Sequence, residues 1–209
     1  MNFELVIFQI VVLVFSVVIH EVSHGFMAEK LGDPTARLAG RLTLNPLKHL
    51  DPVGSVLLPL ILAILPGGII FGWAKPVPYN PFNLKNPEKG AALIAAAGPL
   101  SNFGIAISLS VVYRLLGLAG SETLFILRDF VVIIVLINVV LAVFNLIPIP
   151  PLDGAKVALA FLPDSARGLK SFFYENNPYG WVLLLVFIFA GVPFLSPIIF
   201  AIAGFLLGI

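Results

Sequence analysis

The sequence predicts an all-α polytopic membrane protein, in which a three-helix core is joined by a small β-hairpin and edge strand, a re-entrant segment and C-terminal helices. Two observations support this fold class. Of the 209 residues, 59% are hydrophobic and 11% are charged, whereas ordinary globular chains carry about 25% charged residues. The apolar residues also form runs long enough to cross a bilayer as helices. We therefore expect one membrane-embedded domain over 1–209, with its core at about 1–162 and a hydrophobic extension at 179–209.

The first predicted helix spans residues 3–30, where a long apolar run leads into a polar end. Gly32-Asp33-Pro34 follows it, and residues of these types end helices. In the polar stretch 35–51, leucines alternate with arginines and a threonine, which predicts a short hairpin. Residues 53–70 are apolar but are broken by prolines and glycines.

A second extended piece is predicted at residues 73–79. Its prolines, Pro76 and Pro78, lie two positions apart, so their missing N–H groups fall on one edge of the strand. Only the opposite edge could then pair with a neighbour. This strand is therefore expected at the rim of a sheet.

Two further long helices are predicted at about 89–116 and 122–145. The prolines after the second of them force an extended segment before Asp153-Gly154. A short helix is predicted at 155–162. The last apolar stretch, 181–209, is interrupted by glycine and proline, and it could be one kinked crossing or two half-length helices.

The positions of lysine and arginine orient these elements. Residues 1–19 contain neither, whereas most of the basic residues lie between residues 30 and 89. The positive-inside tendency places the N-terminus outside and this basic region in the cytoplasm. A segment whose two ends are both cytoplasmic cannot cross once. We therefore expect residues 53–70 to enter the membrane and return, or to lie in its interface.

The stretch His20-Glu21-Val22-Ser23-His24 ends the apolar run of the first helix. Residues four apart share a helix face, so His20 and His24 could both present an imidazole nitrogen to one metal ion. Glu21 lies about 100° round the helix from His20, where it could act on water without ligating the metal. Zinc suits neutral imidazoles and an open hydrolytic site. The alternative is a satisfied polar patch, although such residues near a bilayer interior are costly and rarely lack a function.

A zinc site needs a third protein ligand, and Asp153 is the candidate. The third long helix would deliver it to the same side of the membrane as His24. Irregular backbone at membrane depth is tolerated where it lines a cavity or is buried in protein. Asp153 could equally cap the short helix or form an Asp-Gly turn. His49 is expected to be solvated in a cytoplasmic loop and not to bind metal.

These motifs together resemble the site-2 protease family of intramembrane zinc metalloproteases. The resemblance rests on HEVSH in the first helix, on Gly98-Pro99-Leu100-Ser101-Asn102, and on the segment from Asn145 to Asp153-Gly154. It covers about residues 1–160 of the chain.

The resemblance implies a zinc metalloendopeptidase with one zinc ion per chain. The ion would be held by His20, His24 and Asp153 in a core of three helices. Glu21 would be the general base.

Two asparagines are further candidates for the site. The Asn145 amide could donate to an oxyanion, and Asn102 could hold the substrate backbone. For both residues the alternative is hydrogen bonding between helices, which is common in membranes. Asn138 is expected only to pack between helices.

The expected function is hydrolysis of peptide bonds in transmembrane protein substrates, as in regulated intramembrane proteolysis. Such a substrate must unwind locally, and an exposed edge of the hairpin or of residues 73–79 could accept it by β-strand addition. A prokaryotic plasma membrane is expected, with the active site towards the cytoplasmic side. The net charge of +1 predicts no nucleic-acid partner.

Two other classes of function remain open. A membrane transporter would also place polar residues and broken helices within the bilayer, but we find no repeat symmetry between halves. A catalytically inactive zinc-binding membrane adaptor would need no base, and the presence of Glu21 argues against it.

Overall fold

The computed structural model describes residues 3–57, 61, 73–118, 122–163, 165–166, 168, 170–171 and 178–209. This part of the chain is predominantly helical and contains no β-strand. Its α-helices are α1 (Phe3–Lys30), α2 (Thr35–Leu38), α4 (Pro87–Leu118), α5 (Glu122–Asn145), α6 (Asp153–Phe161), α8 (Pro178–Val186) and α9 (Val192–Leu207). Short turns of tighter or wider helix lie at Pro46–Lys48, Pro52–Leu57, Pro81–Asn83 and Phe187–Gly191. The predicted helical fold class is confirmed.

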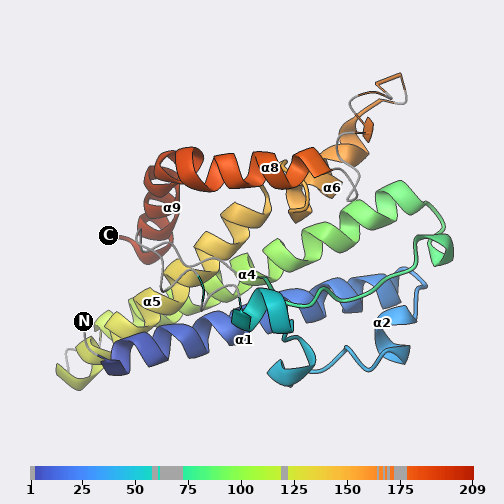
Figure 1. The fold of residues 1–209 in the computed structure, drawn as a ribbon. Coiled ribbons are helices and arrows are strands. Elements are labelled where there is room, and N and C mark those ends of the chain that lie inside the picture. The colour runs from blue at the N-terminus through green and yellow to red at the C-terminus, as the bar shows by residue number, and fades with distance from the viewer. Residues whose placement is uncertain are drawn as a thin grey trace.

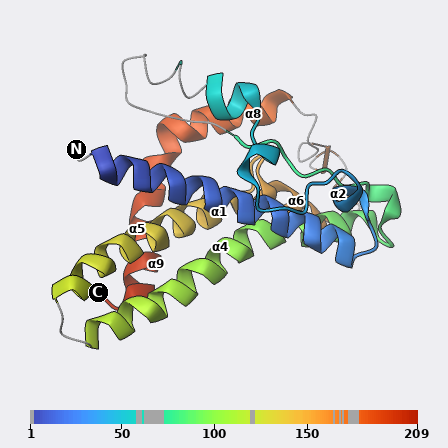
Figure 2. The same cartoon turned by 90° about the horizontal axis from the view of Figure 1, so that it is seen from below.

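Three long helices, α1, α4 and α5, form the core of the structure (Figures 1 and 2). α4 lies at the centre, where it packs against α1, α5 and α6. All three helices begin and end close to the predicted residues, because the apolar runs and the residues that interrupt them are local features. Buried side chains of α4, α5 and α9 form a hydrophobic cluster of Ala106, Tyr113, Val135, Val139, Ile199 and Leu207.

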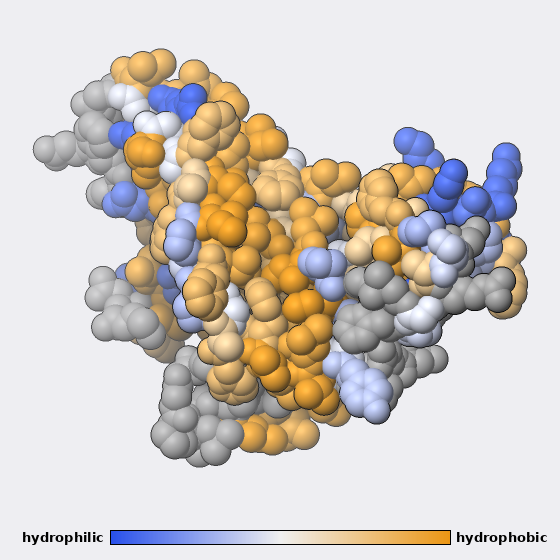
Figure 3. All heavy atoms as spheres, turned by 90° about the horizontal axis from the view of Figure 1, so that it is seen from above, coloured by the Kyte–Doolittle hydropathy of each residue, from blue (hydrophilic) through white to orange (hydrophobic). Residues whose placement is uncertain are grey.

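Four helical stretches of the described residues are long and apolar enough to cross a membrane: Phe3–Lys30, Pro87–Leu118, Leu127–Asn145 and Tyr179–Leu207. Their outward faces carry large apolar side chains, such as Ile10, Phe15 and Leu115. Apolar groups cover the middle of the surface seen in Figure 3. So large an exposed apolar surface suits lipid and not water. The chain is therefore a multi-pass membrane protein.

The fourth apolar stretch is bent. α8 and α9 meet at a steep angle at Phe187–Gly191 (Figures 1 and 2). Pro193, at the start of α9, has no N–H with which to continue the hydrogen bonding of the preceding turn. The stretch is helical throughout, with two halves, α8 and α9, joined by the wide helical turn Phe187–Gly191. The far end of α9 is fastened to α4 by Arg114, which donates to the carbonyls of Leu206 (3.0 Å) and Phe205 (2.9 Å).

The hairpin predicted within 35–51 is wrong. Residues Thr35–Leu38 instead form α2, because the Asp33 carboxylate accepts hydrogen bonds from the N–H (3.2 Å) and the hydroxyl (2.5 Å) of Thr35. Gly40, with a φ of 64°, then turns the chain. The alternating leucines do not share a buried face, since Leu38 and Leu44 are both exposed.

The rim strand predicted at 73–79 is an extended segment beside α1 (Figure 1), and within the described residues it has no partner strand. Its inner edge bonds to irregular backbone and to a side chain instead. The Lys75 N–H donates to the His49 carbonyl (2.9 Å), and the Val77 N–H donates to the Glu21 carboxylate (2.9 Å). Most of the predicted re-entrant segment, namely 58–60 and 62–70, lies outside the described residues.

Asp33 fastens the extended segment to the end of α1. Its carboxylate is fully buried and also accepts hydrogen bonds from the Asn80 N–H (2.7 Å) and the Asn83 amide (2.7 Å). Burial alone would raise the pKa of Asp33, but the hydrogen bonds from Thr35, Asn80 and Asn83 outweigh burial and lower the pKa below its usual value. The carboxylate therefore holds α2 and the end of the extended segment together in its ionised form.

His49 is buried, with 2% of its surface exposed, so the prediction that it is solvated is wrong. Its Nε2–H donates to the Thr43 carbonyl (2.9 Å), and its own carbonyl accepts from Lys75. The loop after α2 closes around this imidazole. His49 therefore helps to position residues 73–79.

Candidate metal centre

α1 places two imidazoles side by side in the protein core. His20 and His24 are one helical turn apart, and their ring centroids are 4.7 Å apart. Both residues are buried, with 6% and 9% of their surface exposed. Two buried imidazoles on one helix face require a polar partner, because an unpaired polar group in an apolar core is costly.

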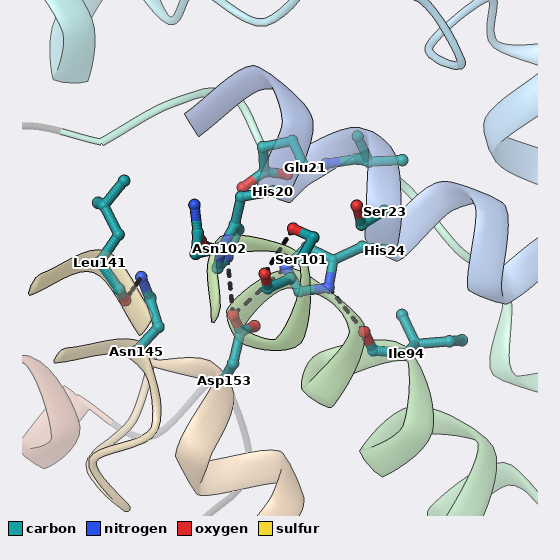
Figure 4. A network of polar contacts seen from close by, with 12 residues as sticks. His20, Glu21, Ser23, His24, Ile94, Ser101, Asn102, Leu141, Asn145 and Asp153 are labelled. Atoms are coloured by element: carbon teal, nitrogen blue, oxygen red, sulfur yellow. Dashed lines mark hydrogen bonds and ion pairs between the residues drawn. The ribbon is translucent and has the colours of Figure 1, made fainter. Parts of the chain in front are cut away.

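α6 supplies that partner in Asp153 (Figure 4). Its Oδ2 lies 3.0 Å from Nε2 of His20 and 3.3 Å from Nε2 of His24. One donor atom from each of the three residues lies within 4.8 Å of the other two, so together they could hold a metal ion. Asp153 does not cap α6, because the cap position is occupied by Leu152.

Gly154 is what allows Asp153 to reach the histidines. A Cβ at this position would lie 2.2 Å from the carbonyl oxygen of Leu146 and 2.4 Å from that of Ile147. Only glycine lets the proline-rich loop after α5 fold so tightly onto the first turn of α6. The Asp-Gly pair therefore combines a ligand-type side chain with the close backbone contact that aims it.

The outer nitrogen of each imidazole is also fixed. Nδ1 of His20 lies 2.6 Å from Oδ1 of Asn102, and Nδ1 of His24 lies 2.7 Å from the carbonyl oxygen of Ile94. Both acceptors are oxygens, so both imidazoles are expected to carry hydrogen on Nδ1. Nε2 then keeps the lone pair that binds a metal, and such outer hydrogen bonds are typical of metal-binding histidines.

Asn102 belongs to a buried network that joins all three core helices. Its amide nitrogen donates to Oδ1 of Asn138 (2.9 Å), and the Asn138 amide donates to the Ser16 hydroxyl (3.0 Å). Asn102 and Asn138 are fully buried. Asn138 thus takes part in packing between the helices, as expected, and does so through hydrogen bonds to α4 and α1. Asn102 faces His20 and not a surface open to a substrate.

Gly98 of α4 faces both imidazoles. A Cβ there would lie 2.5 Å from Nε2 of His24 and 2.6 Å from Nε2 of His20. The absent side chain leaves room beside the lone pairs of both nitrogens. The donor set of two imidazoles and a carboxylate suits zinc. A catalytic zinc site also needs one open position for water or substrate, and the space beside the donors would allow it.

Two other predicted residues are held by hydrogen bonds to groups other than the three donors. Glu21 is half-buried, and its Oε2 accepts a hydrogen bond from the Val77 N–H (2.9 Å). Asn145 lies at the end of α5, where its amide donates to the Leu141 carbonyl of its own helix (2.9 Å; Figure 4). The contact between Val77 and Glu21 was not foreseen from the sequence, although the proline on each side of Val77 marked that N–H as the one donor available there.

This is a polytopic helical membrane protein whose core brings together two imidazoles, a carboxylate and an adjacent glutamate. It therefore has the architecture of a membrane-embedded metalloenzyme. Comparison with known proteins agrees. The model of peptidase family M50 matches residues 118–189, a region that includes Asp153.

The relatives extend this match over most of the chain. The "Putative zinc metalloprotease YwhC" of Bacillus subtilis (strain 168) is 38% identical over 183 residues, which are 86% of this chain and 78% of that protein. The chain therefore belongs to peptidase family M50, the site-2 protease family, and is a zinc metalloprotease.

More distant relatives carry similar names. The "Putative zinc metalloprotease Rip2" of Mycobacterium tuberculosis (strain H37Rv) is 30% identical over 176 residues, which are 84% of this chain and 64% of that protein. The "Zinc metalloprotease MJ0392" of Methanocaldococcus jannaschii is 29% identical over 163 residues, which are 77% of this chain and 36% of that protein. No solved structure matches the chain.

Proposed function

We propose that this chain hydrolyses peptide bonds of transmembrane protein substrates from a site within the membrane, as in regulated intramembrane proteolysis. The observation that carries the proposal is the convergence of His20, His24 and Asp153, which come from two elements separated by α4 and α5. These three residues would hold one zinc ion per chain. When bound, zinc supplies a Lewis acid that acidifies water and polarises a carbonyl.

The site lies at membrane depth. His24 precedes Lys30, the last residue of α1, by six helical residues, which is about 9 Å of rise. The basic residues that follow α1 favour a cytoplasmic location for that end of the helix. We therefore place the site below the cytoplasmic surface of a prokaryotic plasma membrane, in one membrane-embedded domain.

Glu21 is the proposed general base. It follows the first histidine on α1, is half-buried and has no salt-bridge partner among the described residues, so its carboxylate is available to accept a proton from water. The same group would then give the proton to the leaving amine. Asn145 could donate to the developing oxyanion after releasing the Leu141 carbonyl.

Asn102 has a different role from the one that the sequence suggested. Its fully buried amide accepts the Nδ1–H of His20 and is held in turn by Asn138. We therefore assign Asn102 as a positioning residue, which orients His20 towards the metal.

The substrate is expected to enter as an extended strand. Carbonyls of an intact helix are engaged in hydrogen bonds, so a transmembrane substrate must unwind before a scissile bond is exposed. The extended segment 73–79 runs beside α1 and reaches Glu21 through Val77, which makes it the candidate edge for β-strand addition.

The test compares the wild-type protein with Glu21→Gln. Zinc content and cleavage of a labelled transmembrane substrate in proteoliposomes are measured for both proteins. We expect the variant to keep zinc and to lose cleavage by about 100-fold or more, the contribution of a general base. Equal cleavage by the two proteins would refute the role of Glu21, and loss of zinc from the variant would show that Glu21 is a ligand.

A further inference from the structure

Two large apolar side chains outside the membrane-spanning helices are almost uncovered. Phe82, in the turn Pro81–Asn83, is 94% exposed, and Leu38, the last residue of α2, is 79% exposed. The Asp33 carboxylate joins the two segments, because it accepts hydrogen bonds from the N–H groups of Thr35 (3.2 Å) and Asn80 (2.7 Å). Phe82 and Leu38 therefore belong to neighbouring parts of the structure.

Both segments lie level with the last two turns of α1 (Figure 1). A Cβ on Gly25 would lie 3.1 Å from the Cβ of Ala36 in α2, and Leu84, which follows the turn, packs in one cluster with Ala28. Gly25 and Ala28 precede Lys30, the last residue of α1, by about 8 and 3 Å of helical rise. Because α1 crosses the membrane and ends here, the two apolar side chains lie at the interface between hydrocarbon and headgroups.

Three lysines accompany them at this end of the molecule. Lys30 ends α1, Lys85 follows the turn, and Lys89 lies in the first turns of α4. All three residues are exposed, and within the described ranges none of their ammonium groups has an ion pair or a hydrogen bond. Their charge is therefore directed outward and not to the protein.

The acidic residues of the same region do not offset this charge at the surface. Glu29 is paired with Nε of Arg37 (2.6 Å), and Glu88 is paired with Nζ of Lys170 (2.7 Å). Asp33 is fully buried and is engaged by the hydrogen bonds described above. The exposed charge beside Phe82 and Leu38 is therefore positive.

We propose that Lys30, Leu38, Phe82, Lys85 and Lys89 form a collar that binds anionic phospholipids of the leaflet at this end of the core helices. Phe82 and Leu38 enter the boundary between headgroups and acyl chains, where exposed apolar side chains are stabilised. The ammonium groups attract the negative charge of headgroups such as phosphatidylglycerol. Lipid is favoured over a soluble partner because the collar already lies at the membrane interface.

The test uses the absence of cysteine from the sequence, which allows one fluorophore to be attached at a chosen position. Phe82→Cys carries the fluorophore in the collar. Ile10→Cys carries it on an exposed part of α1, in a stretch without lysine or arginine, and is the matched control. Each full-length protein is reconstituted in phosphatidylcholine vesicles that contain an equal, small fraction of nitroxide-labelled phosphatidylcholine or phosphatidylglycerol.

We expect the phosphatidylglycerol quencher to be enriched about fivefold over the phosphatidylcholine quencher at position 82, the contribution of one lysine near a charged surface. At position 10 the two lipids should quench equally. Equal quenching at position 82 would overturn the preference for anionic lipid, and quenching by neither would show that position 82 does not reach the bilayer. Quenching that grows as the protein is diluted in the membrane would show instead that a second copy covers the collar.

A second comparison tests the lysines. Lys85→Gln combined with Lys89→Gln, in the protein labelled at position 82, should bring the two lipids close to equal quenching. Lys48→Gln combined with Lys75→Gln removes the same charge from exposed residues outside the collar and should keep the preference. A preference that survives the collar substitutions would overturn the role of these lysines.

Salt gives an independent readout of the same attraction. The preference at position 82 should fall when the salt concentration rises from about 0.1 to about 1 M, because the Debye length falls from about 10 to about 3 Å. A preference that is independent of salt would contradict an electrostatic origin. None of these measurements depends on proteolysis, so their outcome is separate from that of the proposed function.

Discussion

Alanine at position 98 is expected to weaken zinc binding strongly. Gly98 is the point at which α4 meets both imidazoles, and the added methyl would stand 2.5 Å from Nε2 of His24 and 2.6 Å from Nε2 of His20. Ordinary van der Waals contact begins at 3.4 Å, so both rings or the helix would have to move. The methyl would also occupy space beside the lone pairs that bind the metal.

The size of the effect follows from what holds the rings. His20 and His24 are fixed through Nδ1 by the Asn102 amide and the Ile94 carbonyl, so neither ring can turn aside without breaking a buried hydrogen bond. Inserting a methyl group into a packed core costs about 1–3 kcal/mol. If the zinc-bound state bears that cost, zinc affinity falls about 5- to 150-fold.

Competition for zinc with a graded chelator, followed by assay of cleavage, measures this effect. Gly104→Ala is the matched control, because it adds the same methyl to α4 at a position with nothing within 4 Å. Its zinc affinity should equal that of the wild type. Wild-type affinity and cleavage in Gly98→Ala would refute the conclusion that this glycine faces the metal.

Two further substitutions test the surroundings of the site. Asn102→Ala should weaken zinc binding about 10- to 100-fold, because His20 loses the amide that orients it; an unchanged affinity in a zinc titration would contradict this. In Asp33→Asn, the free energy of unfolding should decrease less steeply with falling pH than in the wild type. The folded-state pKa of Asp33 is below its ordinary value of 3.8, so its contribution is present above that value and is lost as the pH falls through the folded-state pKa. Thermal unfolding of both proteins from neutral pH to below 3.8 measures this, and parallel curves would count against the assigned shift.

The long helices could be predicted because their determinants are local. Each apolar run is bounded by glycine, proline or polar residues, which favour the end of a helix. The hairpin failed because alternation does not show which side chains become buried. α2 depends on Asp33, whose other partners, Asn80 and Asn83, are distant in the sequence.

The metal centre was predictable to the extent that it depends on spacing. Helical periodicity brings the two histidines together, whereas the residues around Asp153 left it open between a ligand and a helix cap, and only the family resemblance favoured the ligand. The outer hydrogen bonds of the histidines and the contact of Val77 with Glu21 could not be foreseen. They join residues 56 to 82 positions apart, and they depend on how far one helix or segment slides along another.

The separation of His20 from Asp153 by 133 positions has a consequence for biosynthesis. The N-terminal span leaves the ribosome first, and it carries both imidazoles but no carboxylate partner for them. Two more long helices and the start of α6 must be inserted before the third donor arrives. On the proposed assignment of these three residues, a half-made chain lacks the third donor and so has no complete metal centre.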